Sequence, residues 1–266
     1  MKRSFLRRSM AVAILAASFT PAVAGDFQGF IIGGVPVTDI KELPWQVALL
    51  RGTSTAPFQF CGGSIVAPQW ILTAAHCAEG LSPQQVDVLA GTVFKTSGGV
   101  RVDSTALFIH PKWGQTGTDY DFDAALIKLE EPLAVGSAIE LASSATEPPV
   151  DFQTRVSGWG ATSEGGPSSN QLLFVDVPVV SNETCNAPSS YNGIVSQNMI
   201  CLGKVAGGQD SCQGDSGGPA VMMGETKKLV GIVSWGWGCA RPNYFGVYTR
   251  VSSVKDWVDA TIAANK

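Results

Sequence analysis

The chain has 266 residues, of which 45% are hydrophobic and 15% are charged, and its formal net charge is −4 at pH 7. Residues 1–30 contain four basic side chains and one acidic side chain, so the rest of the chain carries a net charge of −7. This charge argues against nucleic acid as a partner, which requires a basic face, and no apolar run after residue 30 approaches the ~20 residues of a membrane span.

The N-terminus has the pattern of an export signal. Four basic residues stand among the first eight, an apolar run follows over residues 10–19, and residues 22–24 read AVA. This pattern predicts a signal peptide over residues 1–24 that is cleaved after Ala24, and therefore a secreted protein, extracellular or periplasmic. The alternative, a membrane anchor, requires a longer apolar run. The pair Arg7–Arg8 is also compatible with a twin-arginine export route.

Short apolar runs, separated by Gly, Pro, Ser and Asn, favour antiparallel strands in barrels or sandwiches. The runs are residues 45–50, 63–66, 70–73, 124–129, 172–180, 229–234 and 246–251. Residues 132–149 are rich in Pro, Ala and Ser and are the best candidate for a linker between two halves. Near the C-terminus, Val254, Trp257, Val258 and Ile262 recur at helical spacing after a possible cap at Ser252 or Ser253, which predicts a docked helix.

Two motifs carry reactive side chains. Residues 73–77 read TAAHC, and residues 210–219 read DSCQGDSGGP. A serine nucleophile requires a base within hydrogen-bond reach, and the base requires an orienting acceptor. The chain contains two histidines, His76 and His110. Together the two motifs resemble those of the trypsin-like serine endopeptidases of the chymotrypsin fold, and the resemblance covers nearly all of residues 31–266.

The same serine also satisfies the G-x-S-x-G pattern of α/β-hydrolases. Those enzymes place their histidine after the serine, and no histidine follows Ser216. The α/β-hydrolase reading is therefore disfavoured. A homologue that binds without catalysis is a second alternative, but such proteins normally lack one of the reactive residues, and none is missing here.

The resemblance implies an all-β fold of two six-stranded antiparallel β-barrels, with the active site in the cleft between them and a C-terminal α-helix. The peptidase domain would span residues 31–266, with the first barrel at about 31–140, the second at about 141–250 and the helix at about 252–264. A monomer is the default for the family, and peptides or proteins are its substrates.

The resemblance also assigns the reacting groups. Ser216 would attack the scissile carbonyl, His76 would be the general base, and Asp123 would orient the imidazole. Asp123 is chosen because it lies three residues before the Leu of a Leu-Ile-Lys-Leu run; Asp119 and Asp121 are interpreted as turn residues.

Other family positions would support these groups. Ser234 and the backbone of Ala75 would help to hold the Asp123 carboxylate. The N–H groups of Gly214 and Ser216 would form the oxyanion hole. His110 resembles a structural surface stretch of the family.

A carboxylate lies six residues before the candidate nucleophile. By resemblance, Asp210 would form the floor of the specificity pocket and would select Arg or Lys, because a desolvated carboxylate requires a cation. Gly236, Gly238 and Gly246 would keep the pocket open. The remaining substrate-binding positions implied by the family are Ser211, Gln213, Ser234, Trp235 and Trp237.

Six cysteines remain after the predicted signal peptide, and an even number in an exported chain predicts a disulfide framework. Six cysteines allow fifteen pairings; the resemblance implies Cys61–Cys77, Cys185–Cys201 and Cys212–Cys239. Metal binding is the alternative, but no CxxC spacing occurs. Neither a metal nor a cofactor is expected, and residues 90–100 lack the glutamates of the family's calcium loop.

Residues 31–34 read IIGG and resemble the mature N-terminus of the family. Cleavage after Phe30 would free the α-amino group of Ile31, which would pair with Asp215. The activation propeptide would be residues 25–30. No Lys or Arg occurs between Arg8 and Lys41, so a different, Phe-accepting protease is the expected activating partner. The alternative is that export processing itself ends at Phe30.

Overall fold

The computed structural model describes residues 31–51 and 58–266 of the chain. The predicted signal peptide (1–24) and propeptide (25–30) lie outside these residues. In the described part, no helix is long and apolar enough to cross a membrane.

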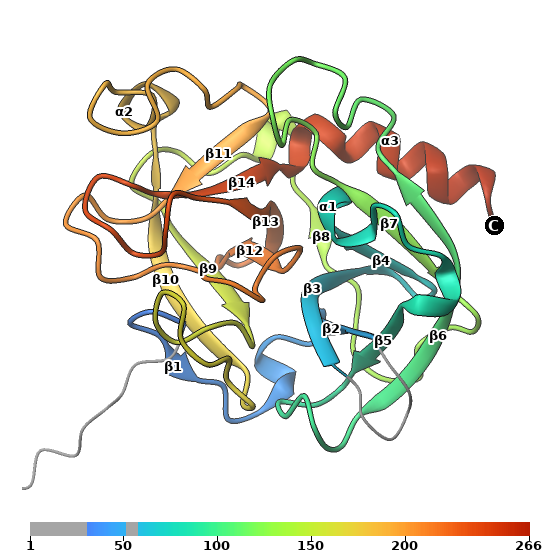
Figure 1. Cartoon of the computed structure of the whole chain (residues 1–266). Helices are drawn as coiled ribbons and strands as arrows, with labels where there is room; N and C mark the ends of the chain where they lie inside the picture. The colour runs from blue at the N-terminus through green and yellow to red at the C-terminus, as the bar shows by residue number, and fades with distance from the viewer. Residues whose placement is uncertain (1–30, 52–57) are drawn as a thin grey trace, which may run out of the picture.

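The first barrel is a closed ring of six antiparallel strands, in the order β2-β3-β4-β7-β6-β5. Its core contains Val47, Ile71, Leu126 and Ile127, all fully buried. Closure leaves no exposed strand edge, and the ring occupies the blue-to-green half of Figure 1. Its strands are β2 (Gln46–Arg51), β3 (Phe58–Ala67), β4 (Trp70–Thr73), β5 (Asp87–Ala90), β6 (Val100–Ile109) and β7 (Ala125–Leu129).

The second barrel has six strands in the ring order β9-β10-β11-β14-β13-β12, and β12 pairs back with β9 to close it. Its strands are β9 (Gln153–Gly158), β10 (Leu173–Val180), β11 (Met199–Leu202), β12 (Pro219–Met222), β13 (Lys228–Trp235) and β14 (Gly246–Arg250). The predicted fold of two six-stranded antiparallel barrels is therefore confirmed.

Two short strands attach to the second barrel. Strand β1 (Val35–Pro36) pairs antiparallel with β10, and β8 (Glu140–Leu141) pairs parallel with β13. The N-terminal segment thus belongs to the second barrel, although the sequence placed it in the range of the first. The N-terminal segment is held there because the Ile31 side chain is fully buried in the core of the second barrel.

The C-terminal helix α3 (Val251–Ala264) packs along the molecule at the upper right of Figure 1. Val254 and Val258 are fully buried, and Trp257 and Ile262 pack against the same core, so the predicted apolar face is confirmed. The predicted cap at Ser252 or Ser253 is wrong. The helix begins at Val251, and its N-cap residue, Arg250, makes no side-chain cap hydrogen bond. The other helices are short: α1 (Ala75–Ala78), α2 (Asn182–Cys185) and the 3-10 turns η1 (Ile40–Glu42), η2 (Pro83–Gln85) and η3 (Ser144–Thr146).

Buried polar contacts join the two barrels. The Ser157 hydroxyl of β9 donates to Gln46 Oε1 of β2 at 2.6 Å. Asp121, interpreted from the sequence as a turn residue, is buried and accepts hydrogen bonds from Ser196 Oγ (2.6 Å) and Asn198 Nδ2 (3.1 Å). These bonds fix the loop before β7 against the second barrel.

His110 is also buried, contrary to the surface position that the resemblance implied. Its ring stacks on Phe122 with centroids 4.8 Å apart, and burial lowers its pKa to about 4. A neutral, stacked ring in the core is a structural element of this loop, which leaves His76 as the histidine at the site.

Candidate active site

The short helix α1 follows β4 and places His76 at the junction of the barrels. His76 Nδ1 lies 2.7 Å from Asp123 Oδ2, and the His76 backbone N–H donates to Oδ1 at 2.9 Å. Asp123 is fully buried just before β7, whereas the His76 side chain is 26% exposed. The carboxylate therefore fixes the Nδ1 edge of the imidazole, while the ring remains partly exposed to solvent.

Groups from the second barrel complete the surroundings of Asp123. The Ser234 hydroxyl of β13 donates to Oδ2 at 2.6 Å, and Thr249 Oγ1 of β14 donates to the backbone carbonyl at 2.7 Å. The resemblance implied Ser234, which is found in place, and the backbone of Ala75, whose part is taken by the N–H of His76. Sequence reasoning missed Thr249 because its strand lies 126 residues away.

Ser216 and His76 line one pocket, which also reaches Asp210. In the described residues no hydrogen bond joins the Ser216 hydroxyl to the His76 ring; such contacts often tighten only when substrate is bound. The predicted binding positions that line the same pocket are Ser211, Gln213, Ser234, Trp235, Gly236, Gly238 and Gly246.

Trp237 lines a neighbouring pocket and is absent from the lining of the first. Trp235, Tyr120 and Ile194 share this second pocket with it, and Tyr120 also lines the first. Tyr120 was not found from the sequence, because it belongs to the loop before β7 that meets the site only in the folded chain. Tyr120 and Trp235 line both pockets, so these two aromatic side chains connect them.

Hydrogen bonds from neighbouring segments hold the backbone carbonyls around Gly214. The carbonyl of Gln213 accepts from Ala161 N at 2.7 Å, that of Gly214 from Gln59 Nε2 at 2.8 Å, and that of Ser216 from Gly62 N at 2.7 Å. Gly214 has φ +93°, a conformation that favours glycine. Within the described chain the N–H groups of Gly214 and Ser216 donate to no protein acceptor.

Asp210 is only 5% exposed, yet one of its oxygens is unsatisfied. Oδ2 accepts from Ala240 N at 2.9 Å, while Oδ1 has no hydrogen-bond partner among the described residues. Burial raises the pKa of Asp210 to about 7, against the opposing effect of the backbone hydrogen bond from Ala240. A Cβ at Gly246 would lie 2.7 Å from Oδ1, so the adjacent position must be glycine to leave this oxygen accessible.

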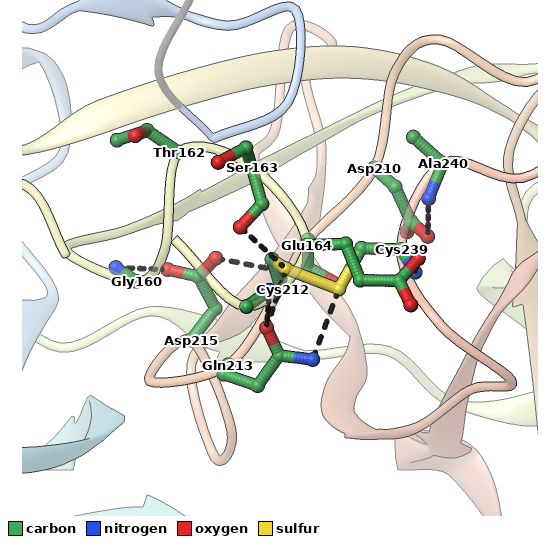
Figure 2. The surroundings of a disulfide bond; sticks show 12 residues. Gly160, Thr162, Ser163, Glu164, Asp210, Cys212, Gln213, Asp215, Cys239 and Ala240 are labelled. Carbon is green, nitrogen blue, oxygen red and sulfur yellow. Dashed lines mark hydrogen bonds between the residues drawn. A yellow bond between two sulfur atoms is a disulfide. The ribbon is translucent and has the colours of Figure 1, made fainter. Parts of the chain in front are cut away.

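Asp215 is fully buried, and Figure 2 shows it bonded to Gly160 beside the Cys212–Cys239 disulfide. Its oxygens accept from Gly160 N at 2.7 Å and from Cys212 N at 2.9 Å. It forms no ion pair with any cation of the described chain. Burial raises its pKa to about 6, which the two hydrogen bonds and the charge of Lys95 oppose.

Gly238 lines the pocket, and its lack of a side chain has a second consequence. Its φ is +83°, and a Cβ there would lie 2.7 Å from Glu164 Oε2 and would also clash with the Arg241 side chain. Arg241 Nε donates to Glu164 Oε2 at 2.8 Å, and the same oxygen accepts from Cys239 N at 3.3 Å. Gly238 therefore makes room for an ion pair that the sequence analysis missed, rather than only for the pocket.

The three disulfides are those that the resemblance implied: Cys61–Cys77, Cys185–Cys201 and Cys212–Cys239. The sulfurs of Cys61 and Cys77 lie near the His76 ring, within the ligand spacing of a metal site. Because both sulfurs are used in the disulfide, neither is a thiolate that could bind a metal. The third bond joins the segment of Ser216 to the turn that carries Ala240 (Figure 2).

Comparisons with known proteins agree with this geometry. A family model described as Trypsin matches residues 31–258. A protein named Trypsin from Simulium vittatum is 42% identical over 243 residues, covering 90% of this chain and 95% of the relative. Trypsin zeta from Drosophila erecta is 43% identical over 249 residues (88% and 86% of the two chains), and Trypsin 5G1 from Aedes aegypti is 41% identical over 233 residues (86% and 84%).

Proposed function

The chain belongs to the trypsin family and is a serine endopeptidase, and from this premise we propose that it is a secreted enzyme, made as a zymogen, that cleaves after Arg or Lys. The observation that supports the specificity is Oδ1 of Asp210, which has no hydrogen-bond partner among the described residues and belongs to the pocket lined by Ser216 and His76. A buried carboxylate without a cation is costly, and a substrate guanidinium or ammonium would supply the missing charge and donors.

In the proposed mechanism, Ser216 Oγ attacks the carbonyl carbon of the scissile bond and His76 accepts the serine proton. His76 then donates that proton to the leaving amine, which gives an acyl-enzyme that water hydrolyses by the same steps. The 2.7 Å contact with Asp123 holds Nδ1 protonated, so that Nε2 is the basic nitrogen, and stabilises the imidazolium. These are the triad roles of the family, applied to this chain's residues.

The developing oxyanion would be bound by the N–H groups of Gly214 and Ser216. Both are free of protein acceptors in the described chain, and the carbonyls beside them are held by hydrogen bonds. Donors fixed in advance stabilise the transition state without reorganisation, and loss of one typically costs about 3 kcal/mol.

Two observations support activation by cleavage after Phe30. Ile31 has φ +42°, which is unfavourable for a β-branched residue, and its fully buried side chain ties this backbone to the second barrel. Hydrolysis of the Phe30–Ile31 bond would remove the constraint on φ and create an ammonium group. Asp215 is buried and forms no ion pair within the described chain, and we assign it as the acceptor of that ammonium, as in the family.

The specificity is tested with para-nitroanilide peptides that differ only in a final Arg, Phe or Ala. The chain beginning at Ile31 should hydrolyse the Arg substrate with by far the highest kcat/KM. Preference for Phe would indicate a chymotrypsin-like pocket, preference for Ala an elastase-like one, and no turnover of any substrate would leave only a binding role.

The activation step is tested with purified protein that begins at Gly25. This form should be nearly inactive and should gain activity when a Phe-accepting protease exposes Ile31, as N-terminal sequencing would verify. Pairing raises the pKa of an α-amino group above its ordinary ~7.7–8.0, so activity should persist below the raised pKa and decline as the pH passes through it. Full activity of the Gly25 form would overturn the zymogen proposal.

A further inference from the structure

Lys95 lies on the loop between β5 and β6, which forms backbone hydrogen bonds with the second barrel. Its backbone N–H donates to the Asn170 carbonyl at 3.1 Å, and Phe94 forms a β-bridge with Gln171. The side chain is half-buried, and burial lowers its pKa while the charge of Asp215 raises it. A partly desolvated ammonium needs hydrogen-bond acceptors in place of the water it has lost.

The ammonium group is held by neutral acceptors only. Lys95 Nζ donates to Ser168 Oγ at 2.7 Å, to the Trp159 carbonyl at 3.4 Å and to Gln59 Oε1 at 3.4 Å. No carboxylate of the described residues lies within 4 Å of it. The contacts therefore do not form a surface salt bridge, and the charge acts on the amide groups beside it.

Two of these acceptors are amide groups, and the N–H of each amide donates a hydrogen bond to the segment 214–216. The amide of Gln59, which is buried, accepts from Lys95 through Oε1 and donates through Nε2 to the Gly214 carbonyl at 2.8 Å. The peptide group between Trp159 and Gly160 accepts from Lys95 through its carbonyl and donates through its N–H to Asp215 Oδ1 at 2.7 Å. The bond between Gly160 and Asp215 is visible at the left of Figure 2.

We propose that Lys95 is a positioning residue for the oxyanion-binding N–H groups, acting through the amides of Gln59 and of the Trp159–Gly160 peptide. A positive charge at the carbonyl end of an amide polarises it and strengthens the bond that its N–H donates. The ammonium thus orients two hydrogen bonds, one that fixes the Gly214 carbonyl and one that fixes the side chain of Asp215. This inference rests on the proposed function, because it gives a role to residues behind the proposed oxyanion hole.

The arrangement predicts an effect on the transition state and not on substrate binding. In the chain that begins at Ile31, Lys95→Met removes the charge but keeps the length of the side chain. We expect kcat for an Arg substrate to fall by about tenfold, less than the 10²–10³ lost with a whole donor, while KM stays within about twofold. Lys95→Arg, which retains a cation, should recover most of kcat.

Two ligands separate positioning from a general loss of structure. A peptide aldehyde ending in argininal adds to Ser216 Oγ, the serine proton passes to His76, and the resulting oxyanion lies at Gly214. Its affinity should fall about tenfold in Lys95→Met, in parallel with kcat. Benzamidine, which occupies only the pocket of Asp210, should bind with unchanged affinity.

A second variant and a matched control complete the test. Gln59→Leu removes the donor to Gly214 and should reproduce the loss of kcat, and the double variant with Lys95→Met should be less impaired than the product of the two single effects. Lys128→Met is the control, because Lys128 is also half-buried and donates to a backbone carbonyl, that of Asn265 at 2.5 Å, away from this network.

Unchanged kcat in both Lys95→Met and Gln59→Leu would overturn the proposal. So would equal losses of benzamidine and aldehyde affinity, which indicate a structural role for Lys95. Failure of the unsubstituted enzyme to bind benzamidine or to cleave Arg substrates would instead count against the proposed function itself.

Discussion

Asp123 and the pair Asp210 and Asp215 are all buried carboxylates, but they are satisfied in opposite ways. Both oxygens of Asp123 are bonded by groups of the chain itself, from His76 and Ser234. Among the residues that the structure describes, one oxygen of Asp210 has no partner, and Asp215 accepts only backbone N–H groups. Burial raises the pKa of Asp210 to about 7 and that of Asp215 to about 6.

The difference divides the site into two parts: one whose hydrogen bonds are complete before substrate binds or the chain is cleaved, and one whose bonds are not. The His76–Asp123 pair is assembled by both barrels and needs nothing from outside the chain. The segment 210–216 carries two carboxylates that each require a cation, which we assign to the substrate side chain for Asp210 and to the new N-terminus for Asp215. The following changes test this division, from the largest expected effect to the smallest.

The largest loss is expected where the chemistry itself is removed. Ser216→Ala should reduce kcat by about 10⁴–10⁶ while leaving the melting temperature nearly unchanged, since a single hydroxyl is lost. His76→Ala should be about as damaging, and the double variant little worse, because the two groups act as a unit. Substantial turnover by either single variant would show that the assembled half of the site is not the catalytic one.

Asp210→Ser should act selectively on basic substrates. Loss of one partner of a buried charge pair costs about 2–5 kcal/mol, or roughly 30-fold to several thousand-fold in kcat/KM for Arg and Lys substrates. Phe and Leu substrates should be affected far less. If the two substrate classes fall equally, Asp210 is not the cation-binding floor of the pocket.

Gly246→Ala should narrow the same pocket without removing its charge. The added Cβ would lie 2.7 Å from Asp210 Oδ1 and 2.8 Å from Tyr248 Cε2. Overpacking typically costs 1–3 kcal/mol, so we expect kcat/KM for Arg substrates to fall by about tenfold to hundredfold. Gly224→Ala is a matched control, since its Cβ would meet only one atom, at 3.8 Å; equal effects of the two variants would contradict the steric argument.

Glu164→Gln should have the smallest effect. Glu164 and Arg241 form an ion pair with side chains 38% and 53% exposed, and exposed pairs contribute little because water and salt screen them. We therefore expect kcat/KM to change by less than about fivefold, and the change to shrink at high salt. A tenfold loss that persists in 1 M salt would show that the turn beside Asp210 depends on this pair.

The sequence predicted those parts of the fold and site that have a local signal. The motifs around His76 and Ser216 and the Leu-Ile-Lys-Leu run after Asp123 identified residues that the structure brings together. Apolar runs predicted β4, β7, β10 and β13 within a few residues. These strands can be recognised in the sequence because most of their buried residues are apolar.

Strand β9 had no apolar run that could predict it, because polar residues are among its buried side chains. Strand β9 contains Thr154 and Ser157, which are buried but bonded to the Val177 carbonyl and to Gln46. Nothing local distinguishes such residues from an exposed strand or loop. The same reason hides Gln59 and Lys95, whose partners lie 155 and 73 residues away.

The most direct test of the division between the two halves is the pH dependence of benzamidine binding to the chain that begins at Ile31. The ligand stays cationic between pH 5.5 and 8, and it should bind the ionised form of Asp210. Because burial raises the pKa of this carboxyl to about 7, titration calorimetry should show affinity rising with pH through this range, with proton release on binding, and Asp210→Asn should abolish both. Benzamidine affinity that is independent of pH and survives Asp210→Asn would contradict the account, because the Asp210 carboxylate would then not be the group that binds the cation.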